Sequence, residues 1–140
     1  MTSAIDDGSP GSLSWAITQA NADPGSTINL ADNLGAITLA GALPIITSAV
    51  TINGGAGDSI SGNNQYRIFF VDTTTPGAAV NINNVSLVNG VATGGAGANG
   101  GGGGLGAGGA LFVNSGHVTI SGITFANNAA IGGAGGNGGA

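Results

Sequence analysis

The chain has 140 residues, the length of about one domain. Only 5% of the residues are charged, against roughly 25% in an average soluble domain, and the formal net charge is -5. Because Arg67 is the one cation beside six aspartates, the chain cannot neutralise a phosphate backbone, which excludes nucleic-acid binding and disfavours anionic membrane surfaces. The hydrophobic fraction of 41% argues against disorder outside the glycine-rich tracts, and the absence of cysteine excludes disulfide stapling.

Residues 12–22 carry the chain's one clear helical pattern. Starting at Leu13, apolar residues recur at positions i, i+3, i+4 and i+7, which form one face of a helix. Ser12 is the expected N-cap, and Asp23-Pro24-Gly25 is expected to end the helix. A helix this short needs an apolar surface to lie on, so we expect residues 1–26 to form an N-terminal cap.

From residue 27 onward the hydrophobic period is two, in short segments that end at Gly, Asn or Pro-Gly. These segments predict strands at Thr27–Leu30, Ala36–Leu39, Ala49–Asn53, Asp58–Ser61, Arg67–Val71, Ala79–Asn83, Val85–Val88, Ala110–Val113, His117–Ser121 and Ile123–Phe125. The side chains expected to face the interior are Ile28, Leu30, Ile37, Leu39, Val50, Ile52, Ile60, Ile68, Phe70, Val80, Ile82, Val85, Leu87, Leu111, Val113, Val118, Ile120, Ile123 and Phe125.

Two stretches of the chain are nearly the same text. Residues 80–97 recur at an offset of 38 as residues 118–135, and a partial copy lies at residues 50–57. Each copy holds paired strands followed by Asn and Gly, and one such unit cannot bury its apolar face alone. Self-similarity at this period therefore predicts stacked repeats.

Short strands of this kind suit either a sandwich or barrel of hairpins or a β-solenoid. One- or two-residue bends such as Asn83-Asn84 and Ser121-Gly122 turn corners rather than close hairpins, which favours the solenoid. We therefore predict an all-β, right-handed parallel β-helix of about three to four coils over residues 27–140, with the helix covering its first coil. Asn53, Asn89 and Asn127 are expected at equivalent turns, where asparagines can stack and adopt a left-handed backbone. The glycine-rich tracts 94–109 and 132–140 are expected to leave one corner, either as mobile loops or as an extended, packed flap that lies on the solenoid.

Candidate catalytic groups are sparse. A glycosidase needs two carboxyl groups about 5–9.5 Å apart, and Asp58 with Asp72 is the best available pair. The plainer interpretation is two turn aspartates, one of them paired with an outward-facing Arg67. His117 is expected to be a surface residue at a strand start, and Trp15 a packing or interface aromatic on the helix.

Residues 54–58, Gly-Gly-Ala-Gly-Asp, approach a glycine- and aspartate-rich calcium repeat, but the aspartate is one position early and later copies carry no acid. We therefore predict no catalytic, cofactor-binding or metal site.

Several segments resemble one class of bacterial proteins. Residues 8–30 resemble the GSLxxAIxxAN cap that opens many secreted right-handed parallel β-helix proteins, and residues 43–45, 50–54 and 62–71 resemble their first coils. Residues 108–111 and 125–128 are similar to the GGA(I/L/V) and FxxN motifs of polymorphic outer-membrane proteins and autotransporter passengers. The resemblance implies a secreted or cell-surface, outer-membrane-associated adhesin. Because the chain stops in a glycine tract without a membrane barrel, the resemblance also implies an N-terminal fragment.

Three functions follow as expectations. The first is a non-catalytic structural or adhesive module whose partner is a protein or glycan on a host or neighbouring cell. The second is a truncated carbohydrate-active β-helix, a polysaccharide lyase or hydrolase. The third is a solenoid that self-associates through its exposed terminal coil into filaments. An ice-binding role ranks last, because Thr73-Thr74-Thr75 is the only threonine triplet.

Overall fold

The computed structural model describes residues 1–138, so the last two residues of the predicted loop 132–140 lie outside the described residues. The described residues form thirteen short strands and one helix. In chain order these are β1 (Ile5–Asp6), α1 (Leu13–Ala22), β2 (Ser26–Asn29), β3 (Ala36–Leu39), β4 (Val50–Asn53), β5 (Ser59–Ser61), β6 (Phe69–Asp72), β7 (Ala79–Asn83), β8 (Ser86–Val88), β9 (Val91–Thr93), β10 (Leu111–Ser115), β11 (His117–Ser121), β12 (Thr124–Ala126) and β13 (Ala129–Ile131). All ten predicted strands are present within two residues of their expected bounds, while β1, β9 and β13 were not predicted.

The strands form four open sheets. Their strand orders are β1-β3-β5-β8-β12, β2-β4-β7-β11, β6-β10 and β9-β13. Every pairing between the described strands is parallel. The structure thus confirms mainly β structure with parallel strands and one short helix, and the alternative of antiparallel hairpins is wrong.

The chain visits these sheets in a fixed order. From β7 to β13 it passes through the four-stranded sheet, the five-stranded sheet, the β9-β13 pair and the β6-β10 pair, and then repeats the order. The register of this return is constant at 38 residues, as in His117 beside Ala79, Thr124 beside Ser86 and Ala129 beside Val91. The repeat read from the sequence is therefore one full pass of the chain.

Like side chains align across the passes and form the core. Ile28, Ile52 and Ile82 occupy one register position of the four-stranded sheet, and Ile37, Ile60 and Leu87 occupy one of the five-stranded sheet. All six are buried in one cluster. In-register parallel pairing thus stacks aliphatic side chains into columns, which is where the apolar burial of this chain lies.

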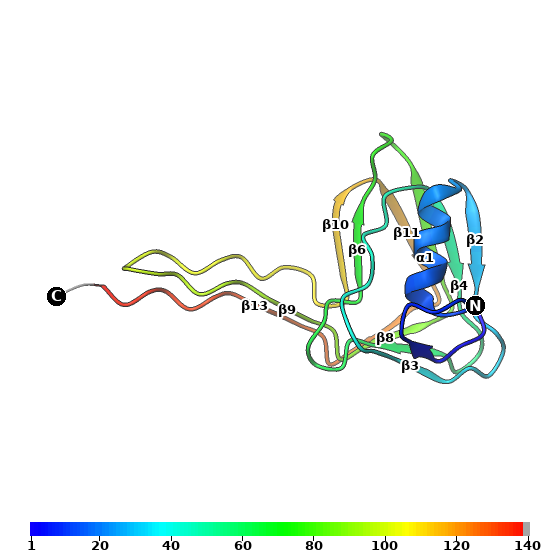
Figure 1. Ribbon diagram of the computed structural model, residues 1–140, viewed down its shortest axis with the longest axis horizontal. Coiled ribbons are helices and arrows are strands. Elements are labelled where there is room, and N and C mark those ends of the chain that lie inside the picture. The colour runs from blue at the N-terminus through cyan, green and yellow to red at the C-terminus, as the bar shows by residue number, and fades with distance from the viewer. Residues whose placement is uncertain (139–140) are drawn as a thin grey trace.

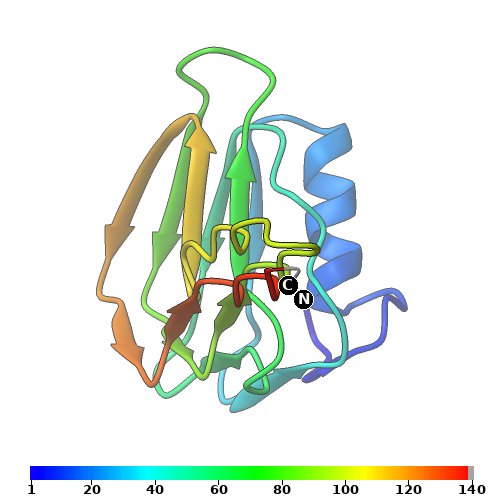
Figure 2. The same cartoon turned by 90° about the vertical axis from the view of Figure 1, so that its left-hand side faces the viewer.

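α1 lies against one side of this core. Ser12 caps it, since its Oγ accepts a hydrogen bond from the Trp15 amide at 3.2 Å. Asp6 of β1, a role the sequence did not suggest, accepts a further bond from the Ser14 amide at 2.7 Å. The face that contains Leu13 and Ile17 is buried in the same cluster as the strands. Figure 2 shows α1, in blue, on one side of the row of strands and the orange strands β11 and β12 on the opposite side.

The asparagine prediction was half right. Asn89 and Asn127 are equivalent left-handed turn residues, with φ of 54° and 55°. Asn53 is not their equivalent, because it pairs in register with Asn29 and Asn83. These three amides form a ladder in which each Nδ2 donates to the previous Oδ1 at 2.9 Å.

Several residues predicted to face the interior are not fully buried. Phe70 is only half-buried, because Ile68 and Phe69 are both buried and the alternation restarts between them. Val113, Ile120 and Phe125 are 41%, 44% and 47% exposed although they continue the buried columns. Leu111, Val118 and Ile123 are half-buried and pack against the core cluster, as predicted. The shared cause is that no described strand pairs with the outer edges of β10, β11 and β12.

Candidate functional site

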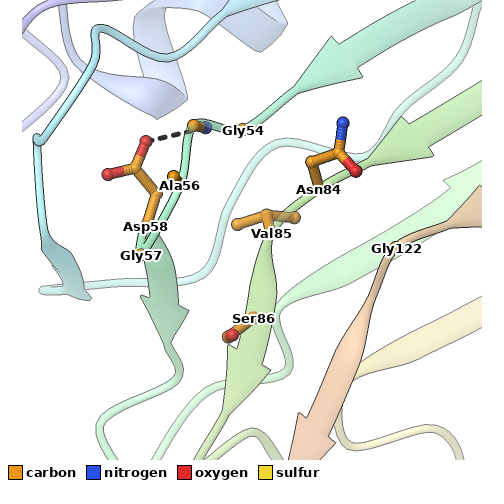
Figure 3. A pocket seen from close by; sticks show the side chains of 9 residues that line it. Gly54, Ala56, Gly57, Asp58, Asn84, Val85, Ser86 and Gly122 are labelled. Carbon is orange, nitrogen blue, oxygen red and sulfur yellow. Dashed lines mark hydrogen bonds between the residues drawn. The ribbon is translucent and has the colours of Figure 1, made fainter.

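The carboxylates considered for catalysis each hold the backbone or a neighbouring strand. Asp58 is buried, and its two oxygens accept hydrogen bonds from the amides of Gly35 at 3.0 Å and Gly55 at 2.9 Å. It lines a hollow of about 420 Å³ together with residues 54–57, 84–86 and Gly122 (Figure 3). Backbone amides are hydrogen-bond donors, which stabilise an anion and do not coordinate a cation. This turn therefore suits the Asp58 carboxylate itself rather than a calcium ion.

Asp72 and Arg67 lie elsewhere. Asp72 accepts hydrogen bonds from Asn114 Nδ2 at 3.1 Å and Ser115 Oγ at 2.9 Å, which joins β6 to β10. The residues that line the Asp58 hollow include neither Asp72 nor Arg67. The structure therefore does not gather in one hollow the three groups that a carbohydrate-active site would use.

The other candidate residues are also accounted for locally. His117 is an exposed residue at the start of β11. Trp15 is partly exposed on α1 and lines a hollow between the helix and β2. Within residues 1–138, no three His, Cys, Asp or Glu side chains cluster in a way that could hold a metal ion.

The carboxyl group of Asp7 is held in a local turn by Ser9. Hydrogen bonds from the Ser9 side chain and backbone amide stabilise its ionised form and lower the pKa of its carboxyl group. A lowered pKa adds stability at neutral pH that is lost as the pH falls through the folded-state value. Because Asp7 is fully exposed at the N-terminal end, this effect belongs to the turn and not to a functional site.

The most distinctive feature is a long glycine-rich arm, which we define as residues 94–107 and 132–138. It leaves the body beyond β9 and β13 as three extended segments that lie side by side, residues 94–99, 100–107 and 132–138 (Figure 1). The segments carry glycine, alanine and asparagine with one leucine, Leu105, and no charged residue. Across residues 1–138, no helix has the length and apolarity that crossing a membrane requires.

The three segments hydrogen-bond to one another in a ring. The amide-to-carbonyl bonds, all 2.7–2.9 Å, are Gly94 to Ile131 and Gly97 to Ala134, Gly133 to Gly104 and Gly136 to Gly101, and Gly104 to Gly95 and Gly101 to Ala98. The first segment thus donates to the third, the third to the second, and the second to the first. A closed set of this kind satisfies backbone groups without a β-sheet.

In each segment, glycines three residues apart face the other segments, and Gly104 is crowded as well. A Cβ atom built on Gly94, Gly97, Gly103, Gly106, Gly133 or Gly136 would lie within 3.0 Å of a backbone atom of another part of the arm or its base. By contrast, a Cβ on Gly95, Gly102, Gly132 or Gly138 would meet nothing within 4 Å. A polyproline II helix has three residues per turn, and where three such chains pack together only glycine fits at the crowded axis. Over the described residues the tracts pack on one another and project from the body, so the expectation of a flap that lies on the solenoid is wrong.

Arg67 anchors the arm at its base, a role the sequence did not suggest. Its Nε donates to the carbonyl oxygens of Ala107 and Gly108 at 3.2 and 3.0 Å, and its Nη2 donates to Ala107 at 2.7 Å. The guanidinium carbon lies 5.3 and 5.0 Å from the ring centres of Phe70 and Phe112. The prediction that Arg67 pairs with Asp58 or Asp72 was therefore wrong: the cation is used by backbone carbonyls and aromatic rings.

We expect Arg67→Met to loosen the base of the arm by about 1–3 kcal/mol, since three charge-assisted hydrogen bonds and the ring contacts are lost. Arg67→Lys should recover only part of this, because an ammonium group cannot reproduce the fork of the guanidinium. Amide hydrogen exchange of Gly94 and Gly133 measures the loosening. Equal protection in the wild type and both variants would show that Arg67 does not hold the arm.

Comparison with known proteins finds no match: no family model, no curated protein and no solved structure is similar to the chain.

Proposed function

We propose that this chain is a non-catalytic module of the bacterial cell surface or of the secreted fraction, and that its arm makes the contact with another cell. The proposed body is a right-handed parallel β-helix. Strands β4–β6, β7–β10 and β11–β13 belong to three successive coils. The parallel pairings, the constant 38-residue return and the aligned columns support this architecture.

The observation that carries the proposal is the arm itself. A chain that orders three glycine-rich segments loses much backbone entropy, because glycine has the most freedom to lose. The hydrogen-bond ring and the Arg67 anchor offset that cost and fix the arm as a projection beyond the body. A fixed, uncharged projection suits contact with a surface rather than chemistry on a substrate.

The chemistry-bearing residues support the same conclusion. Asp58 and Asp72 hold turns and strands together, and Arg67 holds the arm. The resemblance of residues 8–30 to the cap of secreted β-helix proteins supports a proposed location outside the cell. The resemblance of residues 108–111 and 125–128 to motifs of autotransporter passengers supports the proposed export through the outer membrane.

The proposal is tested by binding of the purified, fluorescently labelled chain to cells of the producing bacterium and to cultured animal cells. The matched variant replaces residues 96–105 by a two-glycine link and leaves the body, Arg67 and residues 132–138 in place. The intact chain is expected to bind at least one cell type saturably, and the shortened chain to bind at least about tenfold more weakly, which is about 1.4 kcal/mol.

Two results would contradict the proposal. One is equal binding by both chains, or binding by neither. The other is breakdown of an acidic polysaccharide that Asp72→Asn abolishes, which would assign the chain to carbohydrate chemistry. Circular dichroism of the shortened chain checks that the body remains folded.

A further inference from the structure

The side of the body formed by β10, β11 and β12 is built like the interior but is left uncovered. Val113, Ile120 and Phe125 follow Val71, Ile82 and Leu87 in register, and those three are fully buried. The outer strand edges on this side also carry backbone amides and carbonyls without a described strand partner. Exposed edges with aligned apolar side chains favour pairing with another chain.

The opposite side of the body is closed. α1 packs beside β2, the outer strand of the four-stranded sheet. The outer strand of the five-stranded sheet, β1, has only two residues and is followed by Asp7. A short, charged edge of this kind resists pairing. Head-to-tail stacking, which the predicted filaments require, would have to displace α1, whose own Leu13 and Ile17 are buried in the core cluster.

The charged residues all lie in the first part of the chain, and β10–β12 carry none. All six aspartates and Arg67 lie within residues 1–72, and no Asp, Glu, Lys or Arg follows Asp72. Two copies that each carry a net charge of -5 repel least when their uncharged strands β10–β12 face each other. The charge distribution therefore favours the same surface that the exposed apolar side chains favour.

We propose that two copies of this chain associate through β10, β11 and β12 as a closed two-fold dimer. A two-fold axis brings the same surface of each copy together and reverses the strand direction, so strands pair antiparallel across the contact and the columns continue into the second copy. Because a two-fold contact uses the same surface of both copies, the assembly stops at two. This inference goes beyond the proposed function and holds whether or not the arm binds a cell.

The test is the molar mass in solution, measured by light scattering on a size-exclusion column and by sedimentation equilibrium over a range of concentrations. A dimer is expected. Ile120→Asp combined with Phe125→Asp should raise the dimer dissociation constant at least about tenfold, because each change places two unpaired carboxylates in the contact. Ile5→Asp is the matched control: it also adds a charge at an exposed isoleucine, but on β1 at the closed side, and should leave the mass unchanged.

Single cysteines separate the possible geometries, since the chain has none of its own. Asn114→Cys, Thr119→Cys and Thr124→Cys place one thiol on β10, β11 or β12, and Gln19→Cys places one on α1. With a short bismaleimide, at least one of the first three should give a cross-linked dimer and Gln19→Cys none. A monomer at every concentration, polymers longer than two, or cross-linking from Gln19→Cys would each overturn the proposal; circular dichroism confirms that each variant is folded.

Discussion

Replacing Gly103 with alanine is expected to open the arm, whereas the same change at the neighbouring Gly102 is expected to leave it closed. A Cβ atom at position 103 would collide with the carbonyl oxygen of Gly133. The three nearest atoms all belong to the backbone, so no flexible side chain can move away. At position 102 the added methyl group meets nothing within 4 Å. Alanine there lowers the conformational entropy of the unfolded chain, which stabilises the folded state by about 0.4–1 kcal/mol. The same substitution should therefore destabilise the arm at position 103 and stabilise it slightly, or leave it unchanged, at position 102.

Amide hydrogen exchange of the donors Gly94, Gly97 and Gly133 is the measurement, since these protons report the ring of bonds directly. Gly103→Ala should lower their protection at least about tenfold, a local loss of about 1.4 kcal/mol or more, while the body keeps its protection. Gly102→Ala should leave their protection equal or higher. If both variants behave alike, the arm is not the packed three-segment unit described above.

The repeat, the strands and the aligned core could be predicted from the sequence because they depend on a local signal. Short runs such as Val80-Asn81-Ile82 show the period of two within a few residues, and the offset of 38 then fixes which run lies beside which. β9 (Val-Ala-Thr) and β13 (Ala-Ala-Ile) escaped prediction because three residues beside a glycine tract are too few to show a period of two. β8 and β12 directly precede β9 and β13 in the chain and pair with each other. This pairing brings β9 and β13 together as a further pair of strands.

The arm could be predicted only in part. Glycines recur every third residue at 94, 97 and 100 and again at 103, 106 and 109, which is a visible signal for a polyproline II arrangement. Because eleven of the sixteen residues from 94 to 109 are glycine, glycines also recur at other spacings. The sequence alone therefore does not single out the spacing of three. What selects it is the third segment, residues 132–138, which lies about thirty residues further along the chain and completes the ring.

The error at Arg67 has a similar origin. A lone arginine among aspartates suggests an ion pair, because charge is the property that sequence displays. The actual partners are the carbonyls of Ala107 and Gly108, and a carbonyl is present at every residue and so gives no sequence signal. Phe70 was assigned to the interior for the related reason that strict alternation from Ile68 was assumed, and its outward position is what allows it to contact the guanidinium.

Replacing Ile17 with alanine is the second change expected to have a large effect, because it tests whether α1 is part of the cooperative body. Ile17 is 1% exposed and belongs to the same buried cluster as the strand columns. Truncating a buried isoleucine to alanine costs about 2–5 kcal/mol, a large share of the roughly 5–15 kcal/mol that holds a typical domain folded. Urea unfolding followed by circular dichroism gives the free energy of unfolding by linear extrapolation.

The matched control is Gln19→Ala, two residues along the same helix and exposed to solvent. Alanine is at least as good a helix former as glutamine, so this change should stay within about 0.5 kcal/mol of the wild type. If Ile17→Ala also costs less than about 1 kcal/mol, the helix is an appendage that covers the stack without stabilising it. If the loss is as large as expected, closing one side of the parallel strands is a requirement of this fold. A second copy can meet the same requirement at β10–β12, whose outer edges no described strand covers.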